Sequence, residues 1–125
     1  MCIRDRLTGT WDADKTFSED DWRRGGANFG INSWGPENLA ANVAVVEKLK
    51  VIAADHGKTI PQLAIAWVLA NDTVSVALAG SVTPGEATDN IGGDWEMSPE
   101  LKNEIDDLVI SEGSGVGMPG MEIAT

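Results

Sequence analysis

The chain has 125 residues, with 9 Lys+Arg against 20 Asp+Glu, so its formal net charge at pH 7 is -11. This charge argues against nucleic-acid binding, because a protein that neutralises phosphates needs a basic surface. The composition, 42% hydrophobic and 23% charged, is that of a globular protein and not of a disordered chain.

The apolar runs and the cysteine and histidine counts limit location and chemistry. No apolar run approaches the roughly 20 residues that span a bilayer, and residues 1–6 do not resemble a secretory signal. One cysteine cannot form an internal disulfide, and one histidine cannot complete a Cys/His zinc cluster. We therefore expect a cytoplasmic protein with no membrane span, no metal and no nucleic-acid partner.

Residues 8–36 show neither helical nor strand periodicity, and they carry three of the five tryptophans, Trp11, Trp22 and Trp34. Exposed tryptophans are unfavourable in water, and an irregular segment of this length is usually functional or covered. The tryptophans therefore suggest a packing partner for this part of the chain.

From Glu37 onward the pattern predicts an amphipathic helix. Apolar residues recur at three- and four-residue spacing, at Leu39, Val43, Val46, Leu49 and Ile52/Ala53. Gly57 is expected to end this helix at the C′ position, and His56 in the last turn suits the negative end of the helix dipole. We therefore predict a capping role for His56 rather than the role of a catalytic base.

Thr59 and Gln62 form a capping box, in which the Thr59 hydroxyl accepts from Gln62 N–H and the Gln62 side chain returns to Thr59 N–H. This motif predicts a second helix that runs to about Ala70. The helix is apolar nearly all round, so it needs cover on several sides.

Residues 74–79 are a partly β-branched apolar run, typical of a strand buried on both faces in a parallel sheet. Such a strand needs neighbours, because its backbone N–H and C=O groups must be hydrogen-bonded. No other segment is predicted as a strand. The sequence therefore indicates that part of the fold is missing from the chain.

A third helix is predicted after this strand. Thr83 and Glu86 form a second capping box, with Pro84 at the first helical position, and the helix is expected to stop at the pair Gly92-Gly93.

Ser98 caps a fourth predicted helix, with an apolar stripe formed by Leu101, Ile105, Leu108 and Val109. Asp106 and Asp107 on this helix are expected to be solvated charges rather than an acid/base pair. Order is expected to end after Ile110, so residues 111–125 are predicted as a flexible tail.

The stretch over residues 74–90 is a strand, a Gly80-Ser81 turn and a capped helix, which together form a possible anion site. The free N–H groups and the dipole of the helix favour a phosphate there. In a (β/α)8 barrel a phosphate site lies at the loops after the last strands. The alternative is an ordinary turn between strand and helix that binds nothing.

The order and spacing of these segments resemble the C-terminal part of an aldo-keto reductase. The most specific piece is Pro61-Gln62-Leu63-Ala64 with Trp67, followed at the family's spacing by Gly80-Ser81 and by Asp89-Asn90. The resemblance covers residues 7–110 and implies an α/β fold: the C-terminal part of a (β/α)8 TIM barrel, comprising its last strand and outer helices. The fragment itself would be mostly α-helical with one buried strand, and residues 1–6 would be a foreign N-terminus.

The resemblance implies an NADP-dependent oxidoreductase (NAD possible) that reduces aldehydes or ketones. The cofactor-binding residues would be Gly80, Ser81, Val82, Glu86, Asp89 and Asn90. Among these, the Gly80-Ser81-Val82 backbone and the Ser81 hydroxyl would meet the adenosine 2′-phosphate. Asn90 would bond the adenine amino edge, with Asp89 beside it.

Two departures from the family pattern qualify this assignment. Glu86 stands where the family often has Arg or Gln, so either its carboxylate is fully used in the capping box or the preference for NADP over NAD is weakened. In the family the catalytic tetrad is a tyrosine with a lysine, an aspartate and a histidine, all in the N-terminal half of the barrel. The chain has no tyrosine, so the tetrad is expected to be absent and the chain alone inactive. The alternative function is a small helical protein-interaction module, with no enzymatic activity, that binds through its three N-terminal tryptophans.

Overall fold

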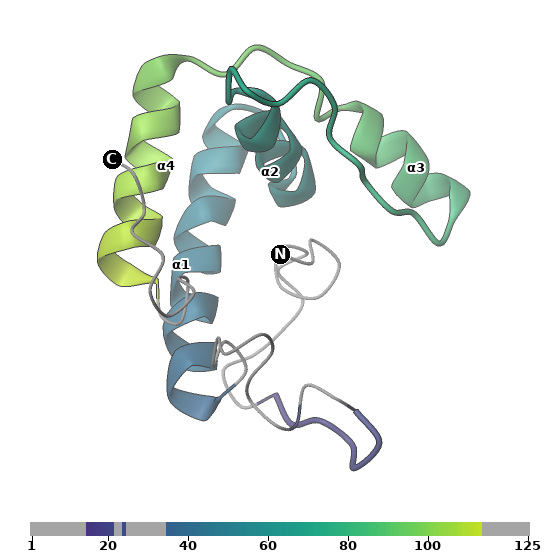
Figure 1. The fold of residues 1–125 in the computed structure, drawn as a ribbon, viewed down its shortest axis with the longest axis vertical. Coiled ribbons are helices and arrows are strands. Elements are labelled where there is room, and N and C mark those ends of the chain that lie inside the picture. Colours follow the sequence, from purple (N-terminus) through teal and green to yellow (C-terminus); the bar gives the residue numbers. More distant parts are fainter. Residues whose placement is uncertain (1–14, 22–23, 25–34, 114–125) are drawn as a thin grey trace.

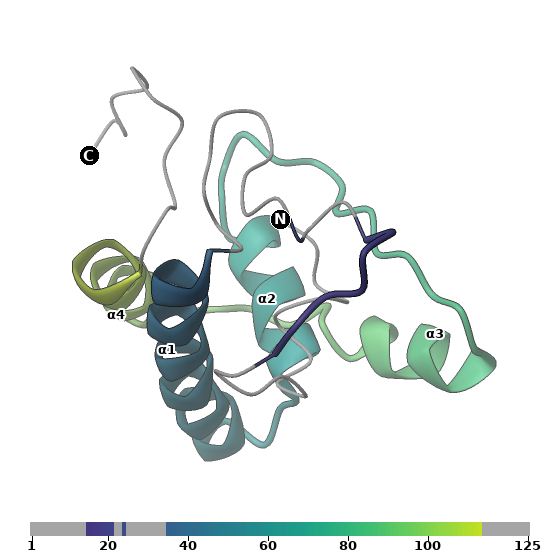
Figure 2. The same cartoon turned by 90° about the horizontal axis from the view of Figure 1, so that it is seen from below.

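The computed structural model describes residues 15–21, 24 and 35–113. This part contains the helices α1 (Pro36–Asp55), α2 (Ile60–Leu69), α3 (Pro84–Ile91) and α4 (Pro99–Glu112). Helix α1 packs against α2 and α4, whereas α3 packs against α2. Figures 1 and 2 show α3 on the far side of α2 from α4. Trp11, Trp22 and Trp34 lie outside the described residues.

The end of α1 confirms the predicted cap. Gly57 has φ 64°, a conformation that a residue without Cβ adopts readily. Its N–H donates to Ala54 O (2.9 Å), and Lys58 N–H donates to Ala53 O (2.9 Å), which is the Schellman arrangement. His56 Nδ1 lies 2.9 Å from Ile52 O. The histidine therefore caps the helix, as predicted.

The hydrophobic core lies between α1, α2 and α4. Leu63 of α2 is only 2% exposed, and the apolar stripe predicted for α4 is buried at Leu101 and Ile105. The stripe predicted for α1 is confirmed at Val46 and Leu49, whereas Val45 and Met97 are core residues that the periodicity did not identify. The core cluster consists of Val45, Val46, Leu49, Ala53, Ile60, Leu63, Ala66, Met97, Leu101 and Ile105.

The structure does not show the buried strand predicted over residues 74–79. The described part of the chain contains no strand, and here Val76 is 70% and Leu78 95% exposed. The residues favour extended backbone, but burial on both faces needs flanking strands and covering helices. In the described residues no element supplies them.

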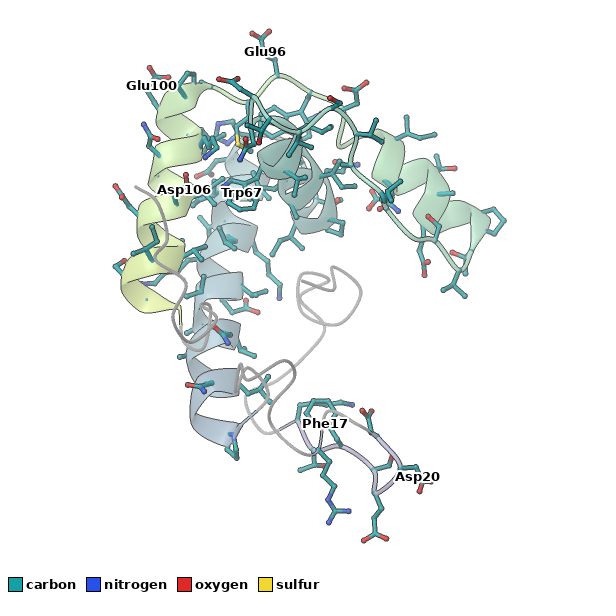
Figure 3. The ribbon with its side chains drawn as sticks, viewed as in Figure 1. Phe17, Asp20, Trp67, Glu96, Glu100 and Asp106 are labelled. Atoms are coloured by element: carbon teal, nitrogen blue, oxygen red, sulfur yellow. The ribbon has the colours of Figure 1, made fainter. Side chains whose placement is uncertain are left out.

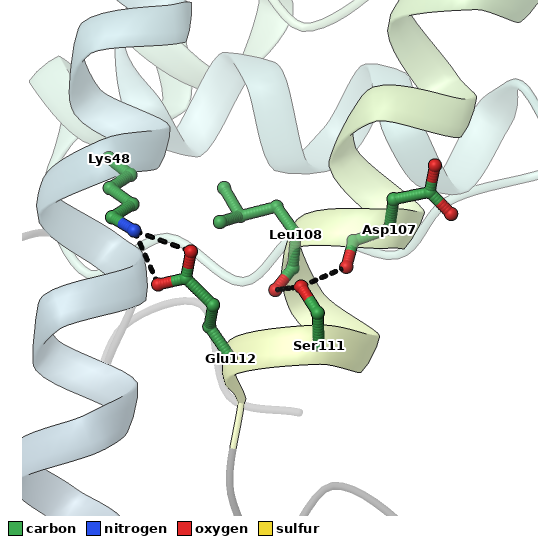
Figure 4. Close-up of polar contacts among 5 residues, drawn as sticks. All are labelled: Lys48, Asp107, Leu108, Ser111 and Glu112. Atoms are coloured by element: carbon green, nitrogen blue, oxygen red, sulfur yellow. Dashed lines mark hydrogen bonds and ion pairs between the residues drawn. The ribbon is translucent and has the colours of Figure 1, made fainter.

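Helix α4 continues to Glu112, two residues past the predicted end at Ile110. Ser111 Oγ donates to Asp107 O at 2.6 Å, and the Glu112 carboxylate pairs with Lys48 of α1 (Figure 4). Both partners of this ion pair are largely exposed, so it contributes little to stability. It does connect the last turn of α4 to α1.

Asp106 has a packing role that sequence patterning missed. Trp67 Nε1 donates to Asp106 Oδ1 at 2.7 Å, and Lys102 Nζ donates to Asp106 Oδ2 at 2.7 Å. Lys102 Nζ also lies 5.7 Å from the centroid of the Trp67 ring. Figure 3 shows Trp67 and Asp106 facing each other between α2 and α4. Asp106 is therefore a half-buried link between two helices, not a solvated charge.

We expect Asp106→Ala to lower the free energy of unfolding by about 1–3 kcal/mol, because it leaves the Trp67 indole N–H without its acceptor. Asp107→Ala is the matched control, since Asp107 is exposed on the same helix and should change stability by less than about 0.5 kcal/mol. Urea unfolding followed by far-ultraviolet circular dichroism measures both. Equal losses in the two variants would contradict the assigned link.

Candidate functional site

The candidate site is the turn over residues 80–83 together with α3. Helix α3 begins at a capping box: Glu86 N–H donates to Thr83 Oγ1 (3.2 Å), and Thr83 N–H donates to Glu86 Oε2 (3.4 Å). Pro84 occupies the first turn, where its missing N–H removes no helical hydrogen bond. The capping box and helix start predicted at this position are confirmed.

The Glu86 carboxylate reaches one residue further back than the capping box requires. Val82 N–H donates to Glu86 Oε2 at 2.7 Å, so a single carboxylate oxygen accepts from two successive backbone amides. These amides precede the positive end of the α3 dipole, where an anion would be stabilised. An internal carboxylate therefore occupies the position at which an external anion was expected.

Asn90 connects the end of α3 to the turn. Its Nδ2 donates to Ser81 Oγ (3.0 Å) and lies 3.5 Å from Gly80 O. The structure thus brings together three of the predicted site residues, because Asn90 contacts Ser81 and Gly80 although it lies nine and ten positions after them. Their amide, hydroxyl and carbonyl groups can donate and accept hydrogen bonds at an exposed turn.

Asp89 is oriented differently, toward α2. Its Oδ1 accepts from Gln62 Nε2 (3.0 Å), and its Oδ2 accepts from Thr59 Oγ1 (3.1 Å). Gln62 Nε2 also donates to Asp89 O at 3.0 Å. The residues that cap α2 therefore also hold α3 in place. The structure does not bring the Asp89 carboxylate to the turn with the other predicted site residues.

Close packing of Gly92 and Gly93 against α2 also positions α3. A Cβ on Gly93 would lie 2.6 Å from Ile65 Cβ, and one on Gly92 would lie 2.3 Å from Gln62 Nε2. Sequence reasoning assigned this pair only to the end of the helix. Their second role is to let the end of α3 approach α2 more closely than any side chain would permit.

Trp95 and Lys58 hold the segment that follows α3. Lys58 Nζ lies 5.5 Å from the Trp95 ring centroid and donates to Gly92 O at 3.5 Å, and the His56 and Trp95 ring centroids are 5.8 Å apart. This contact fixes the exit of α3 against the end of α1. Sequence patterning did not identify it, because no local motif links residues 37 positions apart.

Within residues 15–21, 24 and 35–113, no group of three or more His, Cys, Asp or Glu side chains could hold a metal ion. No helix there is long and apolar enough to cross a membrane.

The sequence profile of the Aldo/keto reductase family matches residues 6–109 of the 125-residue chain. The chain therefore belongs to the aldo/keto reductase family, a family of oxidoreductases built on a TIM barrel whose members generally use nicotinamide cofactors. No solved structure matches the chain. The matched region includes all four helices except the last three residues of α4, and the whole candidate site.

Proposed function

We propose that residues 7–110 are the cofactor-side, C-terminal part of an NAD(P)H-dependent reductase of aldehydes or ketones, with residues 74–79 as a strand of its barrel. The exposure of this segment carries the proposal. Val76 and Leu78 are 70% and 95% exposed, although an uncovered patch of aliphatic side chains usually marks a surface that is covered in the working protein. Neighbouring barrel strands would cover these residues and pair their backbone.

The turn over residues 80–82 and Asn90 would hold the adenosine end of the nicotinamide cofactor. The Ser81 hydroxyl and the Asn90 amide, 3.0 Å apart, support this assignment, because they present donors and acceptors of the kind that recognise ribose and adenine edges. When bound, the cofactor supplies the hydride that reduces the carbonyl carbon. In this proposal the chain's own residues bind and orient the nucleotide.

Proton donation to the carbonyl oxygen is assigned to another part of the working protein. The chain has no tyrosine, the residue that the family resemblance assigns to this step. The remaining parts of the proposal are a cytoplasmic location and a small carbonyl compound as the substrate of the complete enzyme.

A nuclear magnetic resonance titration of the ¹⁵N-labelled chain with NADH, up to millimolar concentration, tests the proposal. We expect the amide signals of residues 80–82 and of Asn90 to shift, with no oxidation of NADH on addition of an aldehyde. Asn90→Ala should weaken binding by about 3- to 10-fold, the equivalent of one hydrogen bond.

The matched control is Asn103→Ala, on the exposed surface of α4, which should leave NADH affinity unchanged. Shifts that avoid the turn, or equal effects of the two variants, would contradict the cofactor site. Aldehyde-dependent turnover by the chain would contradict the assignment of proton donation to another part of the protein.

A further inference from the structure

We propose that Glu86 excludes a 2′-phosphate from this turn, so that the chain accepts NAD(H) in preference to NADP(H). This inference rests on the proposed cofactor site and names the form of the cofactor. The family resemblance implies the opposite preference, for NADP(H). The residues at this turn, however, do not suit a 2′-phosphate.

Two of the backbone donors that a 2′-phosphate could use at this turn are already occupied. The N–H groups of Val82 and Thr83 both donate to Glu86 Oε2, at 2.7 and 3.4 Å, and Glu86 N–H donates to Thr83 Oγ1 at 3.2 Å. A phosphate could reach the first two amides only by displacing the carboxylate. That displacement would also break the half of the capping box in which Thr83 N–H donates to the Glu86 carboxylate.

The charge around the turn also disfavours a phosphate. No lysine or arginine occurs between Lys58 and Lys102, so the segment that carries the site has carboxylates and no cation. Lys58 is engaged at the opposite end of α3, where it donates to Gly92 O and lies over Trp95. A doubly charged phosphate beside Glu86 would therefore be repelled by this carboxylate, and no cation of the segment between Lys58 and Lys102 would offset the repulsion.

A ribose 2′-hydroxyl suits the same carboxylate. Both hydrogen bonds that the Glu86 carboxylate accepts from the described part of the chain end on Oε2. The other oxygen, Oε1, has lone pairs that can accept from a hydroxyl group. In Rossmann-fold dinucleotide sites, an acidic side chain accepts from the ribose hydroxyl of NAD, whereas an arginine accommodates the phosphate of NADP, and the same chemistry applies to a carboxylate at this turn. Glu86 therefore favours the unphosphorylated ribose.

The test uses two probes that differ in the 2′-phosphate, 5′-AMP and adenosine 2′,5′-bisphosphate, titrated into the ¹⁵N-labelled chain. The decisive variant is Glu86→Gln, because glutamine retains the capping box while it removes the charge. Glu104→Gln makes the same charge change on the exposed surface of α4. A urea unfolding midpoint close to that of the unsubstituted chain verifies that each variant is folded.

We expect the unsubstituted chain to bind 5′-AMP about tenfold more tightly than the bisphosphate, and Glu86→Gln to remove most of that difference. Glu104→Gln should leave the ratio unchanged. Bisphosphate binding as tight as that of 5′-AMP, or equal effects of the two variants on the affinity ratio, would overturn the inference. Neither result would contradict the proposed cofactor site. If neither probe shifts the amides of residues 80–90, the proposed function fails and this inference fails with it.

Discussion

Replacing Gly93 with alanine should lower the free energy of unfolding by about 1–3 kcal/mol, the usual effect of overpacking a tight contact. The new Cβ would lie 2.6 Å from Ile65 Cβ and 2.8 Å from Ile65 Cγ2. Ile65 is buried in α2, and its β-branched side chain has few alternative rotamers. It cannot move aside, so α3 would have to separate from α2.

Gly85→Ala is the matched control for this variant. A Cβ on Gly85 would meet only Thr83 Oγ1, at an ordinary 3.8 Å, and alanine is a better helix former than glycine by about 1 kcal/mol. Its stability should therefore be unchanged or higher. Urea midpoints for both variants provide the comparison, and a Gly93→Ala protein as stable as Gly85→Ala would contradict the close approach of α3 to α2.

Leu63→Ala should have the largest effect, a loss of about 2–5 kcal/mol in the free energy of unfolding. Leu63 is 2% exposed and belongs to the core cluster between α1, α2 and α4. Its truncation removes apolar burial and leaves a cavity that the neighbouring helices fill only in part. A small domain has limited stability to lose, so we expect this variant to be substantially unfolded at room temperature.

Leu78→Ala is the informative comparison, because it makes the same chemical change at a residue that is 95% exposed. Its stability should change by less than about 0.5 kcal/mol. Thermal or urea unfolding by circular dichroism distinguishes the two positions. A Leu78 variant as unstable as the Leu63 variant would mean that residues 74–79 are packed in the folded chain.

Helix starts and stops were predictable because they depend on neighbouring residues. The capping boxes of Thr59 with Gln62 and of Thr83 with Glu86 satisfy backbone groups within one turn. Gly57 ends α1 in the positive-φ conformation that the sequence pattern predicts. Each of these features is a local choice that needs no distant partner.

Long-range contacts were not predictable in the same way. Asp106 was expected to be solvated, yet it accepts from Trp67, 39 positions away. Asp89 accepts from Gln62 and Thr59, which local patterning assigned only to the start of α2. A carboxylate looks the same in the sequence whether it faces water or another helix, so only the packing of the helices decides its role.

The sequence by itself determined the four helices, the caps that begin α2, α3 and α4, most of the core residues and the resemblance to the aldo-keto reductases, because these follow from spacing and local hydrogen bonding. Only the tertiary structure decided that residues 74–79 are exposed, that Glu86 occupies the amides of the candidate anion site, and that Asn90 faces Ser81. Strand burial and site geometry depend on hydrogen-bond partners and covering side chains from segments that are distant in the sequence. Local preference can favour an extended segment or a free amide, but only a packed partner determines what covers or occupies it.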